Sequence, residues 1–267
     1  MKQLLNKWLK NTQLFNLRHL KQVVFKQNCL LCNAHQDALV ANTPGHPLSN
    51  SVHEFDSPCI HVVCKACLND LPWHPKTSCP QCGLASNGNI CGSCLSNPPY
   101  FDVTCAVFLY SFPIDAMMVR YKYGNMLNLG DAFGQFISEK LYLEDHKKNI
   151  DLVIPMPMHP QRLKGRGFNQ ALEIAKTLTK NHRGKLDYKS VERQTLTPPQ
   201  ASLPLKERVK NIKGAFKVNT DLIGKSIAIV DDVMTTGASL NELAKTLKKA
   251  GASHVECWVI ARTLPNK

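Results

Sequence analysis

The sequence predicts an α/β fold in which a mostly parallel sheet is flanked by helices, with a small cysteine-rich module before it. From about residue 100 onward, short apolar segments alternate with segments of helical periodicity, which is the pattern of successive βαβ units. Four Cys-x-x-Cys pairs lie before this point, in a segment with little regular periodicity. Pro98 and Pro99 separate the two parts and mark a domain boundary.

Three regions are expected along the 267 residues. Residues 1–28 hold six Lys or Arg residues and no acidic residue, and their apolar positions suit an amphipathic helix, so we expect a basic helical arm. The cysteine-rich module follows over residues 29–99. The α/β domain occupies residues 100–267, which is long enough for an independent core.

The charge and the apolar pattern restrict the partners and the compartment. The formal net charge of +13 favours anionic partners such as phosphorylated metabolites and nucleic acid. No apolar run approaches the roughly 20 residues that a membrane span requires. Lys7, Lys10 and Arg18 interrupt the place where the apolar core of a signal peptide would lie. We therefore expect a cytoplasmic protein, whose eleven cysteines stay reduced and favour metal ligation over disulfides.

Strands of the α/β domain are expected where short apolar runs occur between turn residues. These runs span residues 103–110, 151–156, 186–191, 226–230 and 255–261. A long polar loop follows the third run and reaches about Gly214. The order of the runs, with helical patterns between most of them, predicts parallel strands.

Helices are expected between these strands. Pro113 is suited to open one helix, and residues 127–143 supply another. Asn169 is suited to cap a helix that runs through Leu178. Over residues 237–251 the apolar positions recur with helical spacing, and a glycine is placed to end the helix.

The strongest chemical signal is the run IAIVDDVMTTGAS, in which an apolar strand leads to two acidic residues and then to a turn before a helix. Ligands of open α/β sheets lie beyond the carboxyl ends of the strands. The N–H groups and the dipole of a helix N-terminus favour a phosphate there, so we expect it at Thr235, Thr236, Gly237, Ala238 and Ser239. The carboxylates of Asp231 and Asp232 suit ribose hydroxyls or a divalent cation. The run therefore predicts a site for a phosphorylated sugar.

Two other phosphate-related sites fit this run less well. A receiver domain needs a phospho-acceptor aspartate well downstream of its acidic pair, and no aspartate follows Asp232. A P-loop needs Gly-Lys-Ser or Gly-Lys-Thr, whereas Gly237 is followed by alanine and serine.

A second run, PMPMHPQRLKGRGFNQA, also follows a strand and precedes a helix. Arg162, Lys164 and Arg166 cluster in it among glycines. A flexible cationic loop at the carboxyl edge of the sheet would suit pyrophosphate, and these three side chains are expected to stabilise it as a leaving group. His159 is either a general base near the sugar or a structural, substrate-orienting histidine beside two prolines.

The acidic run resembles the signature of the type I phosphoribosyltransferases, in which four apolar residues precede two acidic residues and a Thr/Gly-rich turn. The resemblance implies a type I phosphoribosyltransferase-like fold for the α/β domain. It also implies that 5-phosphoribosyl-1-pyrophosphate (PRPP) binds there with Mg²⁺. In that case Asp231 and Asp232 contact the ribose hydroxyls, and Thr235–Ser239 hold the 5′-phosphate.

The basic run resembles the ComF family of competence proteins, whose pattern P-x-P-x-H-x-x-R-x-x-x-R-G-F-N-Q is matched over Pro155–Gln170. The pattern continues with R-x-x-x-T-x-x-Q, matched over Arg193–Gln200, and with R-x-x-N-x-x-G-A-F, matched over Arg208–Phe216. In transferases of this type the segment at Arg193–Gln200 belongs to a mobile loop over the reacting centre. The resemblance spans most of residues 29–262 and implies a role in DNA uptake or utilisation.

The cysteine pairs have the spacing of tetrahedral thiolate zinc sites. The pairs are Cys29/Cys32, Cys64/Cys67, Cys79/Cys82 and Cys91/Cys94. They would fill two structural Zn²⁺ sites, and the economical pairing joins the first pair with the second and the third with the fourth. Cys59 and His61 are alternative ligands of the first site. The module resembles the double zinc ribbon of longer ComF-type proteins. Cys105 and Cys257 lie in apolar runs and are expected to be buried.

Two functional hypotheses follow. In the first, the chain is a PRPP-binding, phosphoribosyltransferase-like protein of the ComF type that handles single-stranded DNA, with other DNA-uptake proteins as further partners. Zinc ribbons with a basic surface commonly bind nucleic acid, although ribbons that only dock proteins are about as common. Trp8, Trp73 and Tyr100 are candidates for base stacking, and each of them also suits a core or hinge position.

In the second hypothesis, the chain is an active phosphoribosyltransferase that joins a small nucleobase or amine to the sugar and releases pyrophosphate. Only six residues follow the last expected strand, so we expect no C-terminal hood over the acceptor. The acceptor site would then come from the zinc module or from residues 100–145, where Arg120, Lys122 and Tyr123 are the candidates.

Overall fold

A computed structural model of the chain describes residues 28–34, 63–124, 126–143, 149–181, 184–196 and 211–265. The chain divides into two compact units, Met1–Asp70 and Leu71–Lys267. Apart from Asn28, the expected basic arm lies outside the described residues. No helix in the described ranges combines the length and hydrophobicity that crossing a bilayer requires.

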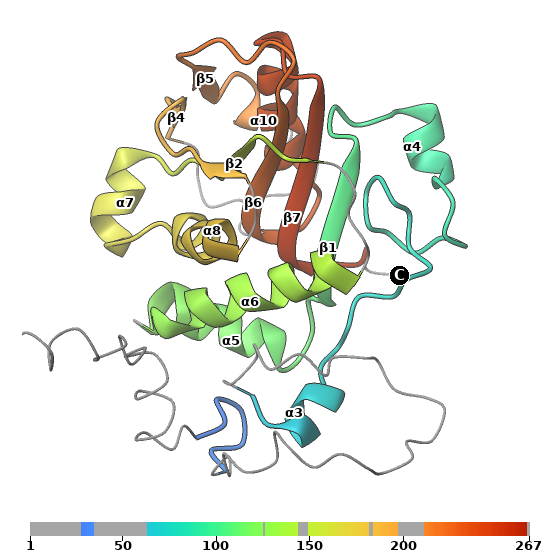
Figure 1. Cartoon of the computed structure of the whole chain (residues 1–267), viewed down its shortest axis with the longest axis vertical. Coiled ribbons are helices and arrows are strands. Elements are labelled where there is room, and N and C mark those ends of the chain that lie inside the picture. The colour runs from blue at the N-terminus through green and yellow to red at the C-terminus, as the bar shows by residue number, and fades with distance from the viewer. Residues whose placement is uncertain are drawn as a thin grey trace, which may run out of the picture. The chain divides into compact units, whose positions relative to one another are not determined.

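The larger unit is built on a five-stranded sheet in the order β1-β7-β6-β2-β3, and all four pairings in it are parallel (Figure 1). These strands are β1 (Val103–Leu109), β7 (His254–Arg262), β6 (Ser226–Met234), β2 (Leu152–Pro155) and β3 (Lys185–Leu186). A separate antiparallel pair is formed by β4 (Val191–Arg193) and β5 (Phe216–Val218). The expected mostly parallel α/β sheet is therefore confirmed.

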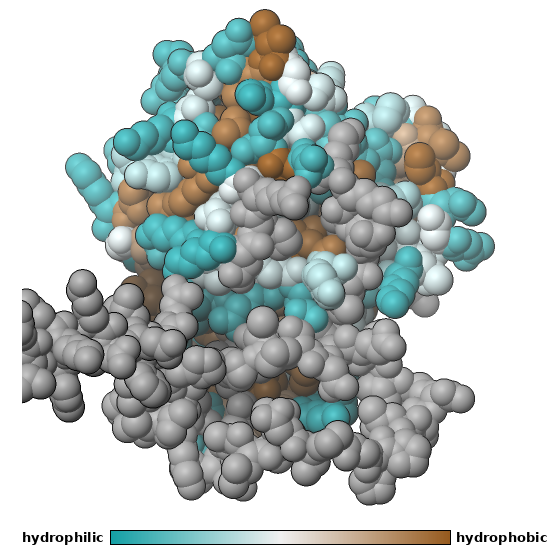
Figure 2. Space-filling model, in the orientation of Figure 1, coloured by the Kyte–Doolittle hydropathy of each residue, from teal (hydrophilic) through white to brown (hydrophobic). Residues whose placement is uncertain are grey.

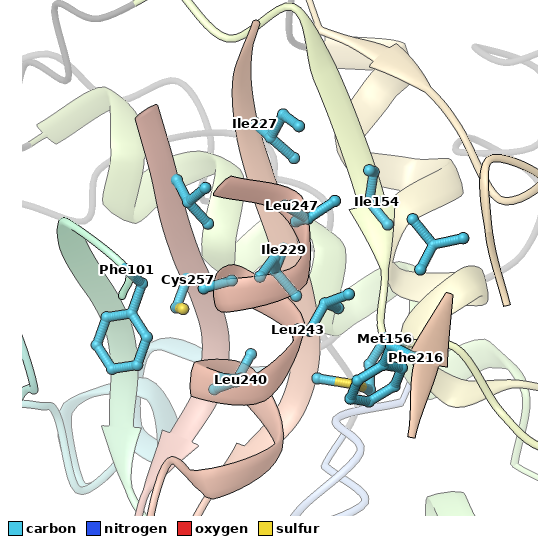
Figure 3. Close-up of a cluster of buried hydrophobic side chains, with 14 of the residues drawn as sticks. Phe101, Ile154, Met156, Phe216, Ile227, Ile229, Leu240, Leu243, Leu247 and Cys257 are labelled. Atoms are coloured by element: carbon cyan, nitrogen blue, oxygen red, sulfur yellow. The ribbon is translucent and has the colours of Figure 1, made fainter. Parts of the chain in front are cut away.

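Helices pack on both faces of this sheet. On one face lie α6 (Asn128–Leu143) and α8 (Gln170–Asn181), which also pack on each other, and on the other face lies α10 (Ala238–Lys249). α5 (Ile114–Tyr123) packs against α6, and α7 (Pro160–Arg166) lies between β2 and α8 along the chain. Leu243 and Leu247 of α10 pack against Ile229 and its neighbours on one face (Figure 3). Val230, which alternates with Ile229 and is equally buried, points to the opposite face, where α8 packs against β6 and β2 beside α6. Burial on both faces explains why the central strands are almost continuously apolar.

The contact between α6 and α8 depends on a small residue. Gly134 of α6 lies so close to α8 that an added Cβ would be 2.6 Å from the Thr177 Cβ and 3.0 Å from the Ile174 carbonyl oxygen. The Thr177 hydroxyl also donates a hydrogen bond to the Asp131 carboxylate of α6. The two helices are thus fixed against each other by close approach and by a polar contact.

The outer edge of β1 is covered by the segment that leads into the second group of cysteines. The Leu109 N–H donates to the Pro72 carbonyl at 2.7 Å, and the His74 N–H donates to the Val107 carbonyl at 2.9 Å. Trp73 stacks on Phe108 with 4.7 Å between the ring centroids. Trp73 is therefore a packing residue, as one of the two alternatives for it proposed.

Three expected elements differ from those observed. The strand expected over residues 226–230 continues to Met234, because β6 goes on pairing with β7 beyond Val230. The strand expected over 186–191 is two strands, β3 and β4. The chain turns between them because the Asp187 carboxylate accepts hydrogen bonds from the N–H groups of Lys189 and Ser190. The loop expected after β2 contains the helix α7.

The two cysteines that were expected in the core of the α/β domain are found there. Cys105 and Cys257 are buried, with 2% and 0% of their surface exposed. Desolvation in the core also raises the pKa of the Cys257 thiol well above its ordinary value. On the face of the molecule in Figure 2, hydrophobic residues are scattered among hydrophilic ones in the coloured part of the surface.

Gly134→Ala is expected to lower the free energy of unfolding by about 1–3 kcal/mol, because the new methyl group would force α6 and α8 apart. Gly165→Ala in α7 is the matched control, since nothing lies within 4 Å of an added Cβ there. That change should be neutral or stabilise the protein by up to about 1 kcal/mol. Urea denaturation of both variants measures the difference, and equal stabilities would contradict the packing described.

Candidate functional site

The candidate site lies beyond the carboxyl ends of β2 and β6, where the sheet topology predicts a crevice. These strands are neighbours, with Pro155 opposite Val230, and the Met156 N–H donates to the Val230 carbonyl at 2.8 Å. After β2 the chain passes through α7 and α8 to β3, on the side away from β6. After β6 it passes through α10 to β7, on the side away from β2. Ligands of open α/β sheets bind where two connections diverge in this way.

Asp231 and Asp232 lie at this crevice, within the last part of β6. By the alternation of the strand, Asp231 shares the face of Ile229, and Asp232 points to the opposite face. The Asp232 carboxylate accepts an ion-paired hydrogen bond from Lys122 of α5 at 2.8 Å. The strand expected over residues 226–230 would leave both aspartates in an exposed loop beyond its end, and this is wrong: both are half-buried within β6, because β7 continues beside them.

The two carboxylates differ in their electrostatic environment. Burial and, second, the neighbouring Asp232 charge raise the pKa of Asp231 to about 7, against the opposing effects of Lys122 and Arg193. Burial lowers the pKa of Lys122, but the Asp232 and Asp231 charges more than offset this, so that the net shift is upward. Asp231 thus exchanges a proton near neutral pH, while Lys122 stays charged beside Asp232.

The turn after β6 leads directly into the N-terminus of α10. Thr235, Thr236 and Gly237 form the turn, while Ala238 and Ser239 are the first residues of the helix. Gly237 has φ of 77°, a conformation in which other residues are strained, and an added Cβ would be 2.8 Å from the Met234 methyl group. No acidic residue occupies the first turn of α10, so the positive end of its dipole keeps its charge for an anion.

The basic run after β2 is ordered as a short helix. His159 is its N-cap, with Nδ1 accepting a hydrogen bond from the Gln161 N–H at 3.2 Å, and Pro160 begins the helix. Gly167 ends it with φ of 85°. The expectation of a flexible loop is therefore wrong for residues 160–166. The position of His159 supports the structural alternative that the sequence left open.

Arg162 and Arg166 lie one helical turn apart on the same side of α7, and Lys164 lies exposed on another side. Arg166 donates to the Gln170 side-chain oxygen at 3.0 Å and lies 5.3 Å from the ring centre of Tyr123. Burial lowers the pKa of Arg162, and the Arg166 charge lowers it further. Like charges held this close are stabilised by an anion between or beside them.

Arg193 of β4 joins this basic group, although its sequence position suggested only a mobile loop. It is 9% exposed and its guanidinium lies 5.7 Å from the ring centre of Phe216. Burial lowers its pKa, Arg162 lowers it further, and Asp231 opposes both. One feature of the sequence could have indicated its role, since Arg193 begins the second stretch of the ComF-type pattern.

A cavity of about 430 Å³ adjoins the basic group. It is bordered by the loop after β2, by the junction of α7 with α8, and by the start of β4. Its walls include Phe168, Tyr188, Glu192 and Arg193, with prolines of the loop. These walls belong to the β2 side of the crevice, where apolar groups and Arg193 lie together with Glu192, whereas Asp231 and Asp232 lie on the β6 side.

The eight cysteines form two groups of four. Cys29, Cys32, Cys64 and Cys67 make the first tetrad, and Cys79, Cys82, Cys91 and Cys94 make the second, with all sulfurs of a group within 4.8 Å of one another. This is the expected pairing. The first tetrad lies in the unit 1–70, next to α3 (Lys65–Asn69), and the second in the unit 71–267, next to α4 (Gly92–Ser96).

The sulfur geometry fits zinc. The Cys32 and Cys64 sulfurs are 3.7 Å apart, and those of Cys82 and Cys91 are 3.6 Å apart. Four sulfurs placed tetrahedrally at about 2.3 Å from Zn²⁺ are separated by about 3.8 Å, whereas a disulfide requires about 2.05 Å. Each tetrad can therefore hold one ion with no position left open for water.

Main-chain N–H groups favour thiolates in both tetrads. The Cys64 N–H donates to the Cys29 sulfur at 3.3 Å, and the Cys91 N–H donates to the Cys79 sulfur at the same distance. Burial raises the pKa of these thiols, but the N–H donors outweigh it, so that the pKa is about 6 for Cys29 and about 7 for Cys79. Such second partners of the ligands tune and orient a metal site.

Several expected site residues are placed differently or lie outside the described residues. Lys122 pairs with Asp232, whereas Arg120 is exposed on α5. Tyr123 lies at the rim of the crevice, 72% exposed. Outside the described residues lie Trp8, Cys59, His61, Thr197, Gln200 and Arg208.

Comparison with known proteins agrees with this architecture. Residues 164–265 match the family of the phosphoribosyl transferase domain. The chain is 31% identical over 194 residues to the DNA utilization protein YhgH of Escherichia coli O6:H1, which covers 71% of this chain and 86% of that protein.

Two further relatives cover still more of the chain. Competence protein F of Haemophilus influenzae is 29% identical over 232 residues, which are 78% of this chain and 98% of that protein. Competence protein ComFC of Streptococcus pneumoniae is 26% identical over 243 residues, 88% of this chain and 99% of that protein. With a phosphoribosyltransferase-type sheet, two cysteine tetrads and these relatives, the chain belongs to the ComF family of competence and DNA-utilisation proteins.

Proposed function

We propose that this protein binds PRPP, or a closely related phosphoribosyl ligand, with Mg²⁺ in the crevice between β2 and β6, and that it serves DNA uptake or utilisation by handling single-stranded DNA. One observation carries the first half of the proposal. The crevice sets the half-buried pair Asp231 and Asp232 on β6 opposite the arginines of α7 and β4. Few ligands need both charges, and a sugar with phosphate groups at two ends is one of them.

Each part of PRPP has a chemically suited partner in the crevice. The carboxylates of Asp231 and Asp232 can accept hydrogen bonds from the ribose hydroxyls. The turn at Gly237 and the N-terminus of α10 suit the 5′-phosphate. Arg162 and Arg193 suit the pyrophosphate. Burial lowers the pKa of both, Arg166 lowers that of Arg162 further and Arg162 that of Arg193, and a bound anion would relieve this repulsion.

The acidic pair also suits Mg²⁺, which prefers oxygen ligands and is commonly held by one or two carboxylates and by substrate phosphates. When bound, the ion would neutralise part of the charge of the pyrophosphate. Lys122 already neutralises Asp232, at 2.8 Å. Asp231, on the opposite face of β6, is therefore the carboxylate more available to the ion or to the ribose.

The DNA half of the proposal is supported by the relatives and by the rim of the crevice. Two of the relatives are named for DNA utilisation and competence. At the rim, Tyr123 is 72% exposed beside Arg166, and before the other end of α5 the ring of Phe112 is 80% exposed. Exposed aromatic rings beside arginines are the usual platform for bases of single strands. The net charge of +13 supplies attraction to the DNA backbone.

The cysteines support a proposal about the compartment. None of the ten cysteines in the described residues forms a disulfide, and eight of them make up the two tetrads. Thiolate tetrads persist where thiols stay reduced, so we propose that the protein works in the cytoplasm, where it would meet both PRPP and other DNA-uptake proteins.

The full chain, purified without chelator, is expected to contain about two Zn²⁺, one in each tetrad. Cys32→Ser and Cys91→Ser should each remove one ion, because structural zinc derives roughly 10–16 kcal/mol of apparent binding energy from a complete ligand set. Elemental analysis by mass spectrometry measures the stoichiometry. Zinc at background level in the wild-type chain would end this part of the proposal.

Replacing both aspartates, Asp231→Asn with Asp232→Asn, is expected to abolish Mg²⁺-dependent PRPP binding. Each lost charged hydrogen bond is worth about 1.5–3 kcal/mol, or roughly 10-fold to 100-fold in affinity. Asparagine preserves the shape of the half-buried sites in β6. In the wild-type protein, affinity should fall as the pH is lowered from 8 to 6, because a proton then occupies Asp231, whose pKa is about 7.

Isothermal titration calorimetry measures these affinities. Asp221→Asn is the matched control, because Asp221 is an exposed aspartate before β6 and its carboxylate caps only the Ile223 N–H. An unchanged PRPP affinity in the double variant would refute the assignment of the crevice. Release of pyrophosphate on addition of a nucleobase or an amine would show that the chain is also an active transferase.

Tyr123→Ala is expected to weaken the binding of a single-stranded oligonucleotide by about 1–3 kcal/mol, the value of one stacked base. Tyr142→Ala is its control, since Tyr142 is as exposed, at 80%, but lies near the far end of α6.

Charge reversal at Lys7 and Lys10, outside the described residues, should weaken DNA binding and reduce its salt dependence. Fluorescence anisotropy over a range of salt concentrations measures both effects.

The aspartate variants separate the two halves of the proposal. They should keep wild-type DNA affinity but lose function in a transformation assay, because the phosphoribosyl ligand is needed there and not for contact with DNA. A complete absence of DNA binding at low salt, together with nucleobase-dependent release of pyrophosphate, would favour a salvage-type transferase instead.

A further inference from the structure

Arg262, the last residue of β7, connects the second tetrad with the turn after β6. Its side chain is 3% exposed. Nε donates to the Cys82 carbonyl at 2.8 Å, and Nη1 donates to the Met234 carbonyl at 3.0 Å and to the Thr235 carbonyl. Cys82 is a member of the tetrad, and Met234 and Thr235 lead into the turn at Gly237. A single planar side chain therefore joins two segments that are far apart in the sequence.

The positive charge of Arg262 is also matched by the negative charge of the second tetrad. Burial lowers the pKa of Arg262, and the nearby Cys82 and Cys94 thiolates oppose this. Four thiolates around one Zn²⁺ carry a net formal charge of about −2, so a loaded tetrad attracts the guanidinium. The cation is thus held between a negative metal centre and the carbonyl oxygens that precede the turn.

Other hydrogen bonds hold the loop of the second tetrad against the edge strand β1. The Thr104 N–H of β1 donates to the Pro80 carbonyl at 2.9 Å, and its hydroxyl donates to the Gln81 carbonyl at 2.6 Å. The His74 ring nitrogen lies 2.8 Å from the Gly83 carbonyl oxygen. The loop that contains Cys79 and Cys82 is therefore held against the edge of β1, and its Cys82 carbonyl contacts Arg262 directly.

We infer that Arg262 is a positioning residue that couples metal occupancy of the second tetrad to the conformation of the phosphate-binding turn. Metal binding fixes the Cys82 carbonyl, Arg262 relays that position to Met234 and Thr235, and the turn then presents its N–H groups in the arrangement that receives a phosphate. By thermodynamic reciprocity, a ligand in the turn must strengthen metal binding by the same factor. This inference rests on the proposed phosphoribosyl site. It gives the second tetrad a role in ligand affinity that the first tetrad does not share.

The experiment uses the full chain and ribose 5-phosphate as the probe. Cys91→Ser, which removes the metal of the second tetrad, should weaken ribose 5-phosphate binding by about 5-fold to 150-fold, the usual range of coupling between sites. Cys32→Ser, which removes the metal of the first tetrad, is the matched control and should leave the affinity within about 2-fold of wild type. Equal effects of the two variants would overturn the inference.

Arg262→Lys tests the bridge itself. Lysine keeps the positive charge but lacks the planar fork that spans the Cys82 and Met234 carbonyls, so the variant should retain two Zn²⁺. In the wild-type protein, ribose 5-phosphate should slow the release of zinc to a chelator. In Arg262→Lys this slowing should disappear, a change that loss of stability alone would not produce. Arg262→Lys with wild-type slowing would refute the bridge.

Hydrogen exchange separates this inference from the proposed function. If wild-type protein fails to bind ribose 5-phosphate, the proposed function is wrong, and the coupling is judged on the amides of residues 234–240. Metal in the second tetrad should slow their exchange in the wild-type chain and not in Arg262→Lys. Identical exchange in wild-type protein with and without that metal would overturn the coupling.

Discussion

The parallel pairing of β2 with β6 is the constraint on which the candidate site depends. Because the two connections leave this pair in opposite directions, the residues that follow each strand face one crevice. The register is also critical. A shift of β6 by one residue would exchange Asp231 and Asp232 between the two faces of the sheet, and Lys122 would then face the wrong carboxylate. The end of the buried apolar run at Val230 holds this register, because a shift of the strand into the core would bury a carboxylate.

The crevice holds charges of both signs in places where burial disfavours them. The pKa of Asp231 is raised by burial, and those of Arg162 and Arg193 are lowered by it. Each of these shifts means that the folded protein stabilises the charged form less than water does. Such groups lower the stability of the empty protein, and a ligand of complementary charge recovers that free energy on binding. Perturbed groups that converge on one crevice are typical of binding sites.

Most of the fold and half of the site could be predicted from the sequence. The parallel sheet, the helices and the pairing of the tetrads follow from local periodicity and from spacing, which need no knowledge of distant contacts. The extension of β6 to Met234 could not be predicted, because two successive aspartates usually end a strand and only pairing with β7 keeps them in one. The helix α7 was missed because its glycine and proline suggest a loop, although His159 and Gly167 cap it.

The residues that sequence reasoning missed in the site share one property. Arg193 and Arg262 act through contacts with residues distant along the chain, such as Arg262 with Cys82 across 180 positions. A single arginine in a strand carries no local sign of such a role. Lys122 was expected near the acceptor, but its partner Asp232 is 110 residues away, a pairing that only the packing of α5 on the sheet defines.

The two borders of the main sheet are protected from self-association in different ways. A border strand exposes unpaired N–H and C=O groups, which can recruit a strand of another molecule and start aggregation. On one border, β3 is only two residues long and offers little to pair with. On the other, β1 is occupied by the stretch from Pro72 to Pro80, which ends in the second cysteine tetrad. If this tetrad holds zinc as proposed, loss of the metal would expose the edge of β1, whose seven residues are mostly apolar, and we expect zinc depletion to promote self-association there.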